Sequence, residues 1–293
     1  MTTTTNNRKP ADTTMMGVVH DALRRDLRRV DATLNAESAV GPERRRALSA
    51  HVEWMMEFLH RHHHGEDKGL WPLLRGRTAE GDALLDRMEA DHAGIAPAIE
   101  DVLKAARRFA TDPADRARTD LQASLRAFSE VLLPHLRREE DDAMPLVAAT
   151  LTEAEWNGWD QKYNVKGKSL SQLGREGQWL MDSLDAARYR VLVHLVPPPA
   201  RLLIIKGFAR SYRKACALRW GLDVPVGPLA SRAGERPGLA TPHDGPVAAG
   251  RPDNNISRLR VRRARPAPKL SDASHSDSQR KETHGADHRT ERH

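Results

Sequence analysis

The chain has 293 residues, enough for one large domain or two smaller ones, and aromatic residues make up only 4% of it. Leu, Ala, Arg and Glu dominate the first 150 residues, a composition that favours helices. The net charge of +7 is unevenly spread: residues 1–150 carry 22 Lys and Arg against 25 Asp and Glu (net −3), and the remainder carries 25 against 15 (net +10). The first half therefore has no basic surface suited to nucleic acid, and any affinity for polyanions belongs to the second half.

The first two predicted elements are amphipathic helices. Residues 12–38 favour a helix that one of the polar residues at 12–14 can cap. Its apolar stripe repeats every three or four residues and comprises Met16, Val19, Leu23, Leu27, Val30 and Leu34. After a Gly-Pro break, a second helix begins near Glu43 and ends in the loop at 75–81. Its stripe comprises Leu48, Val52, Met55 and Leu59.

Two further helices follow the same pattern. The third stripe comprises Leu85, Met88, Ile95, Ile99, Val102, Ala106 and Phe109. The sequence TDPADR at 111–116 stops this helix and starts the next, with Asp112 as the cap and Pro113 at the first helical position. The fourth stripe comprises Leu121, Leu125, Phe128 and Leu132. Four such helices with short connections predict an all-α fold, an antiparallel up-and-down four-helix bundle over residues 12–149.

Each predicted helix places a histidine on its apolar stripe, and two helices add a glutamate one turn later. In chain order these residues are His20, His62 with Glu66, His92, and His135 with Glu139. A single inward histidine is usually an ordinary core residue, but a buried carboxylate is costly without a partner, and a metal ion supplies one. Four imidazoles and two carboxylates on the four walls of a bundle are a ligand set for two metal ions that the carboxylates bridge.

Other polar residues near these positions are less well placed. His60 and His64 fall off the stripe, so we expect them to be solvated, and the same holds for His51. Glu140 is the alternative to Glu139, but it lies about 100° further round the helix. Glu139 is therefore preferred as the ligand.

Asp67 and four prolines also lie close to the candidate ligands. Asp67 is either an acceptor for an imidazole N–H or a surface charge. Pro72 and Pro145 each follow a candidate glutamate by six residues, so we expect them to disturb or end their helices. Pro97 and Pro134 lie inside helical patterns and should kink them.

The order and spacing of these motifs resemble the hemerythrin family, and more narrowly its bacterial cation-binding branch, which is named for its His-His-Glu motifs. The resemblance covers about residues 12–149 and rests on His20, on His62-xxx-Glu66 followed by LWPLL, on MEADH ending at His92, and on His135-xxx-Glu139 followed by Met-Pro. It implies a four-helix bundle around a non-haem di-iron centre. The cofactor would be two carboxylate-bridged iron ions, and the ligand a small oxidant such as O2, H2O2 or NO.

One position departs from the family pattern. Many oxygen-carrying hemerythrins have a fifth histidine one turn before the ligand of the third helix, where this chain has Met88. A thioether is a poor ligand for oxidised iron, so one iron is expected to lack a nitrogen ligand. This shortage argues against reversible oxygen carriage and favours peroxide handling or sensing. His63 could fill the gap only by leaning off its stripe position.

Other metals, other di-metal folds and two classes of function stay open at this point. A ferritin-like centre would use Glu-xx-His pairs, and the chain has Glu57/His60 and Glu89/His92, but three of these four residues lie off the stripes. Zinc is chemically allowed by the same ligands. The protein is either a redox enzyme, most plausibly one that removes peroxide, or a non-catalytic oxygen, nitric oxide or iron sensor that signals through its C-terminal half.

Residues 150–222 predict a helical extension. Thr152 and Glu155 form a capping box, and three tryptophans could close the bundle: Trp156, Trp159 and Trp179. The basic, partly amphipathic segment 200–220 is expected to dock on the bundle or form a self-association face, and the alternative is contact with a membrane surface or an acidic partner.

The ends of the chain have a different composition. Residues 1–11 and 223–293 are expected to be disordered, and the basic run at 258–269 is more typical of a solvated tail than of a nucleic-acid site. The single cysteine, Cys216, excludes an intramolecular disulfide. The N-terminus lacks the apolar segment of a secretory signal, and the most apolar run, 191–209, is interrupted by prolines and two basic residues. We therefore expect a cytoplasmic protein.

Overall fold

A computed structural model gives the arrangement of the chain. It describes residues 9–36, 40–77, 79–195, 201–221 and 227. All regular elements in these ranges are helical, which confirms the all-α prediction, and none of the described helices is both long and apolar enough to cross a membrane. The expected disorder at 228–293, including the basic run at 258–269, and that at 1–8 concern residues outside the described ranges.

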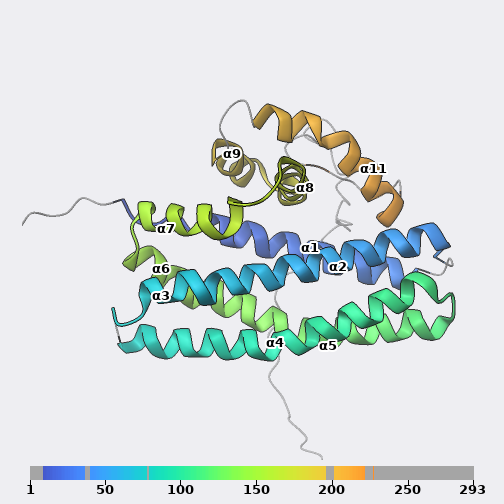
Figure 1. Ribbon diagram of the computed structural model, residues 1–293, viewed down its shortest axis with the longest axis horizontal. Coiled ribbons are helices and arrows are strands. Elements are labelled where there is room, and N and C mark those ends of the chain that lie inside the picture. Colours follow the sequence, from blue (N-terminus) through green and yellow to red (C-terminus); the bar gives the residue numbers. More distant parts are fainter. Residues whose placement is uncertain (1–8, 37–39, 78, 196–200, 222–226, 228–293) are drawn as a thin grey trace, which may run out of the picture. The chain divides into compact units, whose positions relative to one another are not determined.

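Four helical rods lie side by side in the described part of the chain, and each runs back along the one before it (Figure 1). The rods are α1 (Thr14–Asn35); α2 (Pro42–Gly65) continued by η1 (Glu66–Leu70) and α3 (Trp71–Leu74); α4 (Ala79–Thr111); and α5 (Asp115–Arg138) continued by η2 (Glu139–Ala143) and α6 (Met144–Thr150). Their buried faces are the apolar stripes of the sequence. Leu23, Leu48 and Leu132, for example, have no exposed surface.

The two rods that carry the candidate glutamates change from α to π geometry at those residues. The π turns η1 and η2 begin at Glu66 and Glu139, and each is followed by a proline. A proline ring clashes with the carbonyl four residues before it in an α-helix, and the wider π turn lies where that clash would arise. Pro72 and Pro145 therefore disturb their helices, as expected, but do not end them. The prediction of kinks at prolines within α4 and α5 remains a prediction.

The π turn η1 is held by side chains from further along the chain. The carbonyl of Lys68 cannot accept a hydrogen bond from Pro72, which has no N–H, and it accepts one from the Tyr163 hydroxyl at 2.9 Å instead. The carbonyl of Gly65 accepts from Nε1 of Trp159 at 2.8 Å. A Cβ on Gly69 would lie 2.2 Å from the Tyr163 ring, so only glycine allows this approach.

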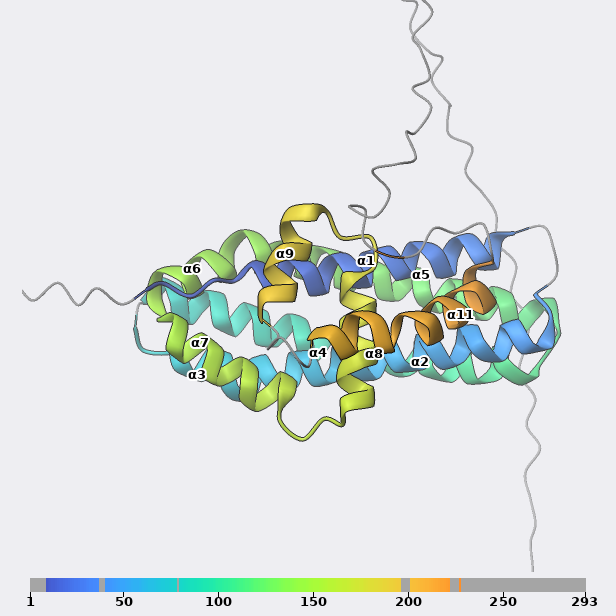
Figure 2. The same cartoon turned by 90° about the horizontal axis from the view of Figure 1, so that it is seen from above.

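The extension is helical and lies against α1 and α2 (Figures 1 and 2). Its elements are α7 (Glu153–Asp160), η3 (Gln161–Val165), α8 (Leu170–Met181), α9 (Ala186–Leu195), η4 (Leu203–Gly207) and α11 (Ala209–Trp220). The capping box at Thr152 and Glu155 is present, and a second one at Ser169 and Gln172 starts α8. The three tryptophans expected to close the bundle are each at most 6% exposed.

Two further segments are tied to the rest of the fold. Residues 201–220 dock on the bundle, because Tyr212, Cys216 and Trp220 of α11 are buried in the same apolar cluster as the rods. Contact of this segment with a membrane surface or an acidic partner stays a prediction. Residues 9–11, which the sequence predicted to be disordered together with 1–8, lie beside 151–153, and the N–H of Ala11 donates to the carbonyl of Leu151 at 3.1 Å.

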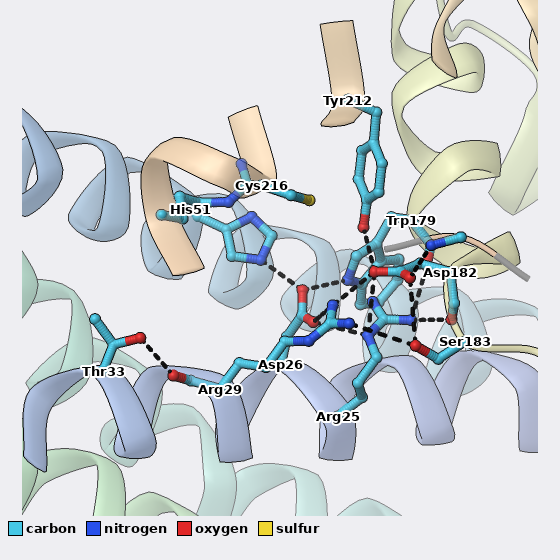
Figure 3. A network of polar contacts seen from close by, with 12 residues as sticks. Arg25, Asp26, Arg29, Thr33, His51, Trp179, Asp182, Ser183, Tyr212 and Cys216 are labelled. Carbon is cyan, nitrogen blue, oxygen red and sulfur yellow. Dashed lines mark hydrogen bonds and ion pairs between the residues drawn. The ribbon is translucent and has the colours of Figure 1, made fainter. Parts of the chain in front are cut away.

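A buried polar network joins α1 to the extension (Figure 3). The carboxylate of Asp26 lies 2.7 Å from Nε2 of His51 and accepts from the Trp179 indole at 2.9 Å and from Arg25 at 2.8 Å. Asp182, at the C-cap of α8, accepts from the Tyr212 hydroxyl at 3.2 Å. These contacts link a bundle helix to α8 and α11.

The expectation that His51 is solvated is wrong. It is 2% exposed, because α11 covers this face of α2 and places Trp220 edge-on to the His51 ring. Burial lowers the pKa of His51 to about 4, so the ring is neutral near pH 7 and its Nε2–H donates to Asp26. Burial by itself opposes ionisation of Asp26, but Arg25 and His51 outweigh it and lower the pKa of Asp26 well below its usual range.

Replacing Asp26 with Asn should lower the free energy of unfolding by about 3 kcal/mol near pH 7, because it removes the nearest counter-charge of the buried Arg25. A folded-state pKa below the unfolded value stabilises the fold above the unfolded pKa, and this stabilisation is lost as pH falls. The difference between wild type and Asp26→Asn should therefore be constant above about pH 5 and shrink below about pH 4. Urea unfolding followed by circular dichroism measures both.

Asp31→Asn is the matched control, because Asp31 is an exposed carboxylate on the same helix. It should change the free energy of unfolding by less than about 0.5 kcal/mol at any of these pH values. A cost for Asp26→Asn no larger than that of the control would contradict the role given to the network.

Candidate metal centre

The six residues singled out from the sequence lie together in the interior, and His63 joins them. Their side chains come from all four rods, and each of the seven residues is at most 6% exposed: His20, His62, His63, Glu66, His92, His135 and Glu139. On every rod, residues on one side of this group belong to one apolar cluster and residues on the other side to a second cluster. The polar group is thus a closed layer between two apolar parts of the core.

The ligand atoms of this layer form two sets. In the first set, His20, His62 and Glu139 each offer an atom, and these atoms lie within 4.8 Å of one another. The second set has the same property and consists of three imidazoles, those of His63, His92 and His135. Two metal ions side by side would each take one set.

The two carboxylates connect these sets. Glu66 places Oε1 3.1 Å from Nε2 of His62 and Oε2 3.6 Å from Nε2 of His92, one histidine from each set. Glu139 lies between the sets in the same way, with Oε2 3.3 Å from Nε2 of His20 and 3.6 Å from Nε2 of His135. Each carboxylate therefore lies where it could bridge two ions.

The donor atoms of the centre have no hydrogen-bond partner among the residues that the structure describes. They are the Nε2 atoms of all five histidines and both oxygens of each glutamate, nine atoms in total. Leaving one buried polar atom unsatisfied costs about 1–3 kcal/mol, and a whole domain is stable by only about 5–15 kcal/mol. Nine such atoms facing one another in a buried layer suit metal ions, because metal ions bind both imidazole nitrogens and carboxylate oxygens.

A second layer of carboxylates orients the imidazoles. Nδ1 of His20 lies 2.8 Å from Glu140, and Nδ1 of His92 lies 2.7 Å from Asp67. A proton held at Nδ1 by these contacts leaves Nε2 free to bind a metal. The structure therefore separates the two neighbouring glutamates: Glu139 lies in the centre, and Glu140 accepts from His20 and is paired with Arg24 at 2.7 Å.

Ionisation in the metal-free centre follows from burial. Burial lowers the pKa of His62 to about 3 and that of His135 to about 4, so both rings are neutral, the form that binds metal. Burial and the neighbouring Glu139 raise the pKa of Glu66 well above its usual value. Burial also opposes the charge of Glu139, but His20 and His135 outweigh it and lower the pKa of Glu139. Metal uptake would therefore displace a proton from Glu66.

His63 changes the inference drawn from Met88. Met88 has no exposed surface and packs in the apolar cluster with Leu85 and Trp71. The His63 ring stacks on that of His92, with centroids 4.0 Å apart and 9° between the planes. The centre thus has five imidazoles, and the expected shortage of a nitrogen donor is not present.

The sequence contains a signal for His63 that the single-stripe argument overlooked. A second series on α2 also has steps of four, three and four: Val52, Met56, Leu59 and His63. All four residues are buried, because α2 contacts α4 on one side and the extension on another, so its buried arc is wider than one stripe. Adjacent apolar pairs such as Met55-Met56 mark this wider arc.

His60 and His64 are exposed, as expected from their position off the stripe. Glu57 is exposed, and Glu89 pairs with Arg75 at 2.9 Å on the outside of the bundle. Only His92 of the two Glu-xx-His pairs points inward, so neither pair of the ferritin-like alternative could hold a metal as a unit.

Comparisons with known proteins agree with this geometry. Residues 12–147 match the family model described as the hemerythrin HHE cation binding domain. The match runs from the residues just before α1 into α6 and includes all seven residues of the centre. No curated protein and no solved structure showed significant similarity to the chain. Residues 12–147 thus form a domain of the hemerythrin HHE cation-binding family.

Proposed function

We propose that this domain holds two carboxylate-bridged, non-haem iron ions and uses them to bind a small oxidant such as O2, H2O2 or NO. The observation that carries the proposal is the set of nine unpartnered donor atoms, arranged in two sets that two glutamates connect. Mixed imidazole and carboxylate donors suit iron. Zinc accepts the same donors, and metal analysis distinguishes the two.

The two sets are unequal, and this inequality suggests where an oxidant would bind. The set of His63, His92 and His135 offers three imidazoles, whereas the other set offers only those of His20 and His62 beside Glu139. An ion in the first set, that of His20, His62 and Glu139, would have one imidazole fewer, so an external ligand would have more room there. Iron bound in this way would supply both the coordination position and the electrons for chemistry with a small oxidant.

The surrounding residues favour such binding by excluding water and fixing the donors. Phe58 stacks on the His62 ring, with centroids 6.2 Å apart, and the layer is closed by apolar clusters on both sides. Glu140 and Asp67 fix the imidazoles of His20 and His92. Five imidazoles are present, so the methionine at position 88 does not count against oxygen binding.

A second candidate function is sensing, in which the state of the iron is passed to the extension. The observation that favours it is a short aromatic path from the centre to α8. Phe58, which stacks on His62, also packs edge-on against Trp179 with centroids 4.9 Å apart. Trp179 in turn donates to Asp26 in the network that holds α8 and α11.

The main proposal predicts that the purified chain, supplied with iron, carries about two iron ions and absorbs in the near-ultraviolet as ferric dinuclear centres do. At least one of O2, H2O2 and NO should change this spectrum while the iron content stays constant. Metal analysis and stopped-flow absorbance measure both quantities. A folded protein that takes up no iron, or an iron-loaded protein that responds to none of the three, would contradict the proposal.

The assignment of His63 predicts a difference between two neighbouring histidines. His63→Ala removes a donor of the three-imidazole set and should lower the affinity for iron at least tenfold, whereas His64→Ala removes an exposed side chain and should leave it unchanged. Met88→Leu should also retain iron, because it replaces one apolar core residue by another of similar volume. Chelator competition gives the affinities. Equal iron retention by the His63 and His64 variants would remove His63 from the centre.

The sensing alternative predicts that the extension responds to the redox state of the iron. Amide hydrogen exchange in α8 and α11 should differ between the ferric and ferrous forms, and Asp26→Asn should abolish the difference. The helix α4 beyond Ile99, which lies away from this path, serves as the internal control. Identical exchange in both redox states would exclude sensing through the extension.

A further inference from the structure

The extension and the bundle line a cavity that is partly open to solvent and that the metal centre does not explain. It has a volume of about 500 Å³, within the range of about 300–1,000 Å³ that is usual for small-molecule sites. Its walls come from α1, α2, α7, η3, α8, α9 and η4. A concave, mostly apolar site with a few polar groups is the usual form of a small-molecule binding site.

Most of the wall is aliphatic or aromatic. Val19 is on the apolar stripe of α1 and packs against the apolar core, yet it is only partly buried and also lines this space. The side chains of Leu173 and Leu180 on α8, of Val165 on η3 and of Val193 on α9 are also partly buried and line it. Such a wall favours an apolar ligand, because burial removes apolar surface from water on both sides.

The walls are held by specific local features. Capping boxes fix the starts of α7 and α8. Gly177 of α8 lets η4 approach closely, since a Cβ there would lie 2.8 Å from the Ile204 side chain. Trp156 and Trp159 of α7 are both buried and form part of the wall. The cavity is therefore bounded by well-fixed elements.

The wall carries charged groups of both signs. The cationic residues Lys168 and Arg201 line it, and Lys168 pairs at 2.6 Å with Glu176, which is 8% exposed. Asp160 accepts a hydrogen bond from Asn164 at 3.0 Å, and burial raises the pKa of Asp160 and so favours its neutral form. A ligand head of either charge would meet a group of its own sign, whereas a hydroxyl or carbonyl could bond with either an acidic or a basic group.

We infer that this cavity is a binding site for a neutral, mainly apolar organic molecule, an aliphatic chain or ring system with one hydroxyl or carbonyl head. Phe58 and His62 form part of the wall, so the occupant lies against a residue of the metal centre. Its presence would change the surroundings of the ion held by His20 and His62. The binding site itself does not depend on the proposed metal function, because His62 is the one residue of the metal centre among the described residues of its wall.

The test uses the full chain without metal and the tryptophans of the wall as reporters. Decanol carrying a terminal bromine, which quenches nearby tryptophan, should quench the fluorescence saturably with one molecule per chain. Competition with decanol, decanoate and decylamine then tests the head group, and decanol should bind at least tenfold more tightly than either charged analogue. Absence of saturable quenching, or equal affinity for all three, overturns the inference.

Two variants locate the site. Val165→Phe combined with Val193→Phe fills the cavity from two walls outside the metal-bearing rods and should weaken decanol binding at least tenfold. Leu218→Phe on α11 lies outside the cavity and is the matched control. If the filled variant does not fold by circular dichroism, Leu180→Gln makes the wall polar at similar volume and should weaken binding to the same extent. Wild-type affinity in a folded variant of either kind overturns the inference.

A measurement on iron-loaded protein separates this inference from the proposed function. Decanol should shift the visible spectrum of the iron-loaded chain, because the occupant lies against His62. Binding in the metal-free chain without any iron uptake would support the cavity site and refute the metal proposal. Iron uptake without decanol binding would do the reverse.

Discussion

Glu66 and Glu139 are fully buried, and none of their four oxygens has a hydrogen-bond partner among the described residues. A carboxylate in this environment has to be compensated by positive charge or protonated. Histidines from all four rods surround the two glutamates. Each rod therefore provides a side chain that can compensate the buried carboxylates. The position of the rods along one another is thereby set by a polar layer as well as by apolar contacts.

The same principle acts a second time where the extension meets the bundle. Asp26 is buried on α1, and its partners come from α1, α2 and α8. The apolar residues of α8 and α11 give the extension affinity for the bundle, and the network around Asp26 gives it one orientation. The extension oriented in this way and the rods together line the cavity.

Helical periodicity was enough to predict most of the bundle and its centre. The steps of three and four residues identified the four rods and brought His20, His62, His92 and His135 to one layer, because a helix fixes relative direction from local spacing alone. The two residues that were misplaced depend on different contacts. His51 is buried by α11, outside the bundle, whereas His63 faces His92 and His135 inside it, on a second buried series of α2. The distance in sequence between α2 and α11 hides such contacts from a local pattern.

The π turns show another limit of local pattern. Pro72 predicted a disturbance of the helix. The carbonyls left without a helical partner at this place accept hydrogen bonds from Tyr163 and Trp159, which lie some ninety residues further along the chain. No periodicity in the second rod could specify those donors. The sequence therefore predicted the place of the irregularity and not its form.

The two π turns also have a consequence for chain length. A π turn accommodates one residue more than an α-helical turn, and one residue corresponds to a rotation of about 100° around the axis. Beyond Glu66 the buried positions are Leu70, Trp71 and Leu74, and beyond Glu139 they are Ala143, Met144 and Val147, the same offsets in both rods. Both rods thus carry an equivalent single-residue surplus directly after the metal-facing glutamate. Deleting one residue from either π turn would rotate the following buried face towards solvent. The number of residues between the glutamate and the proline is therefore as important for this fold as the positions of the histidines.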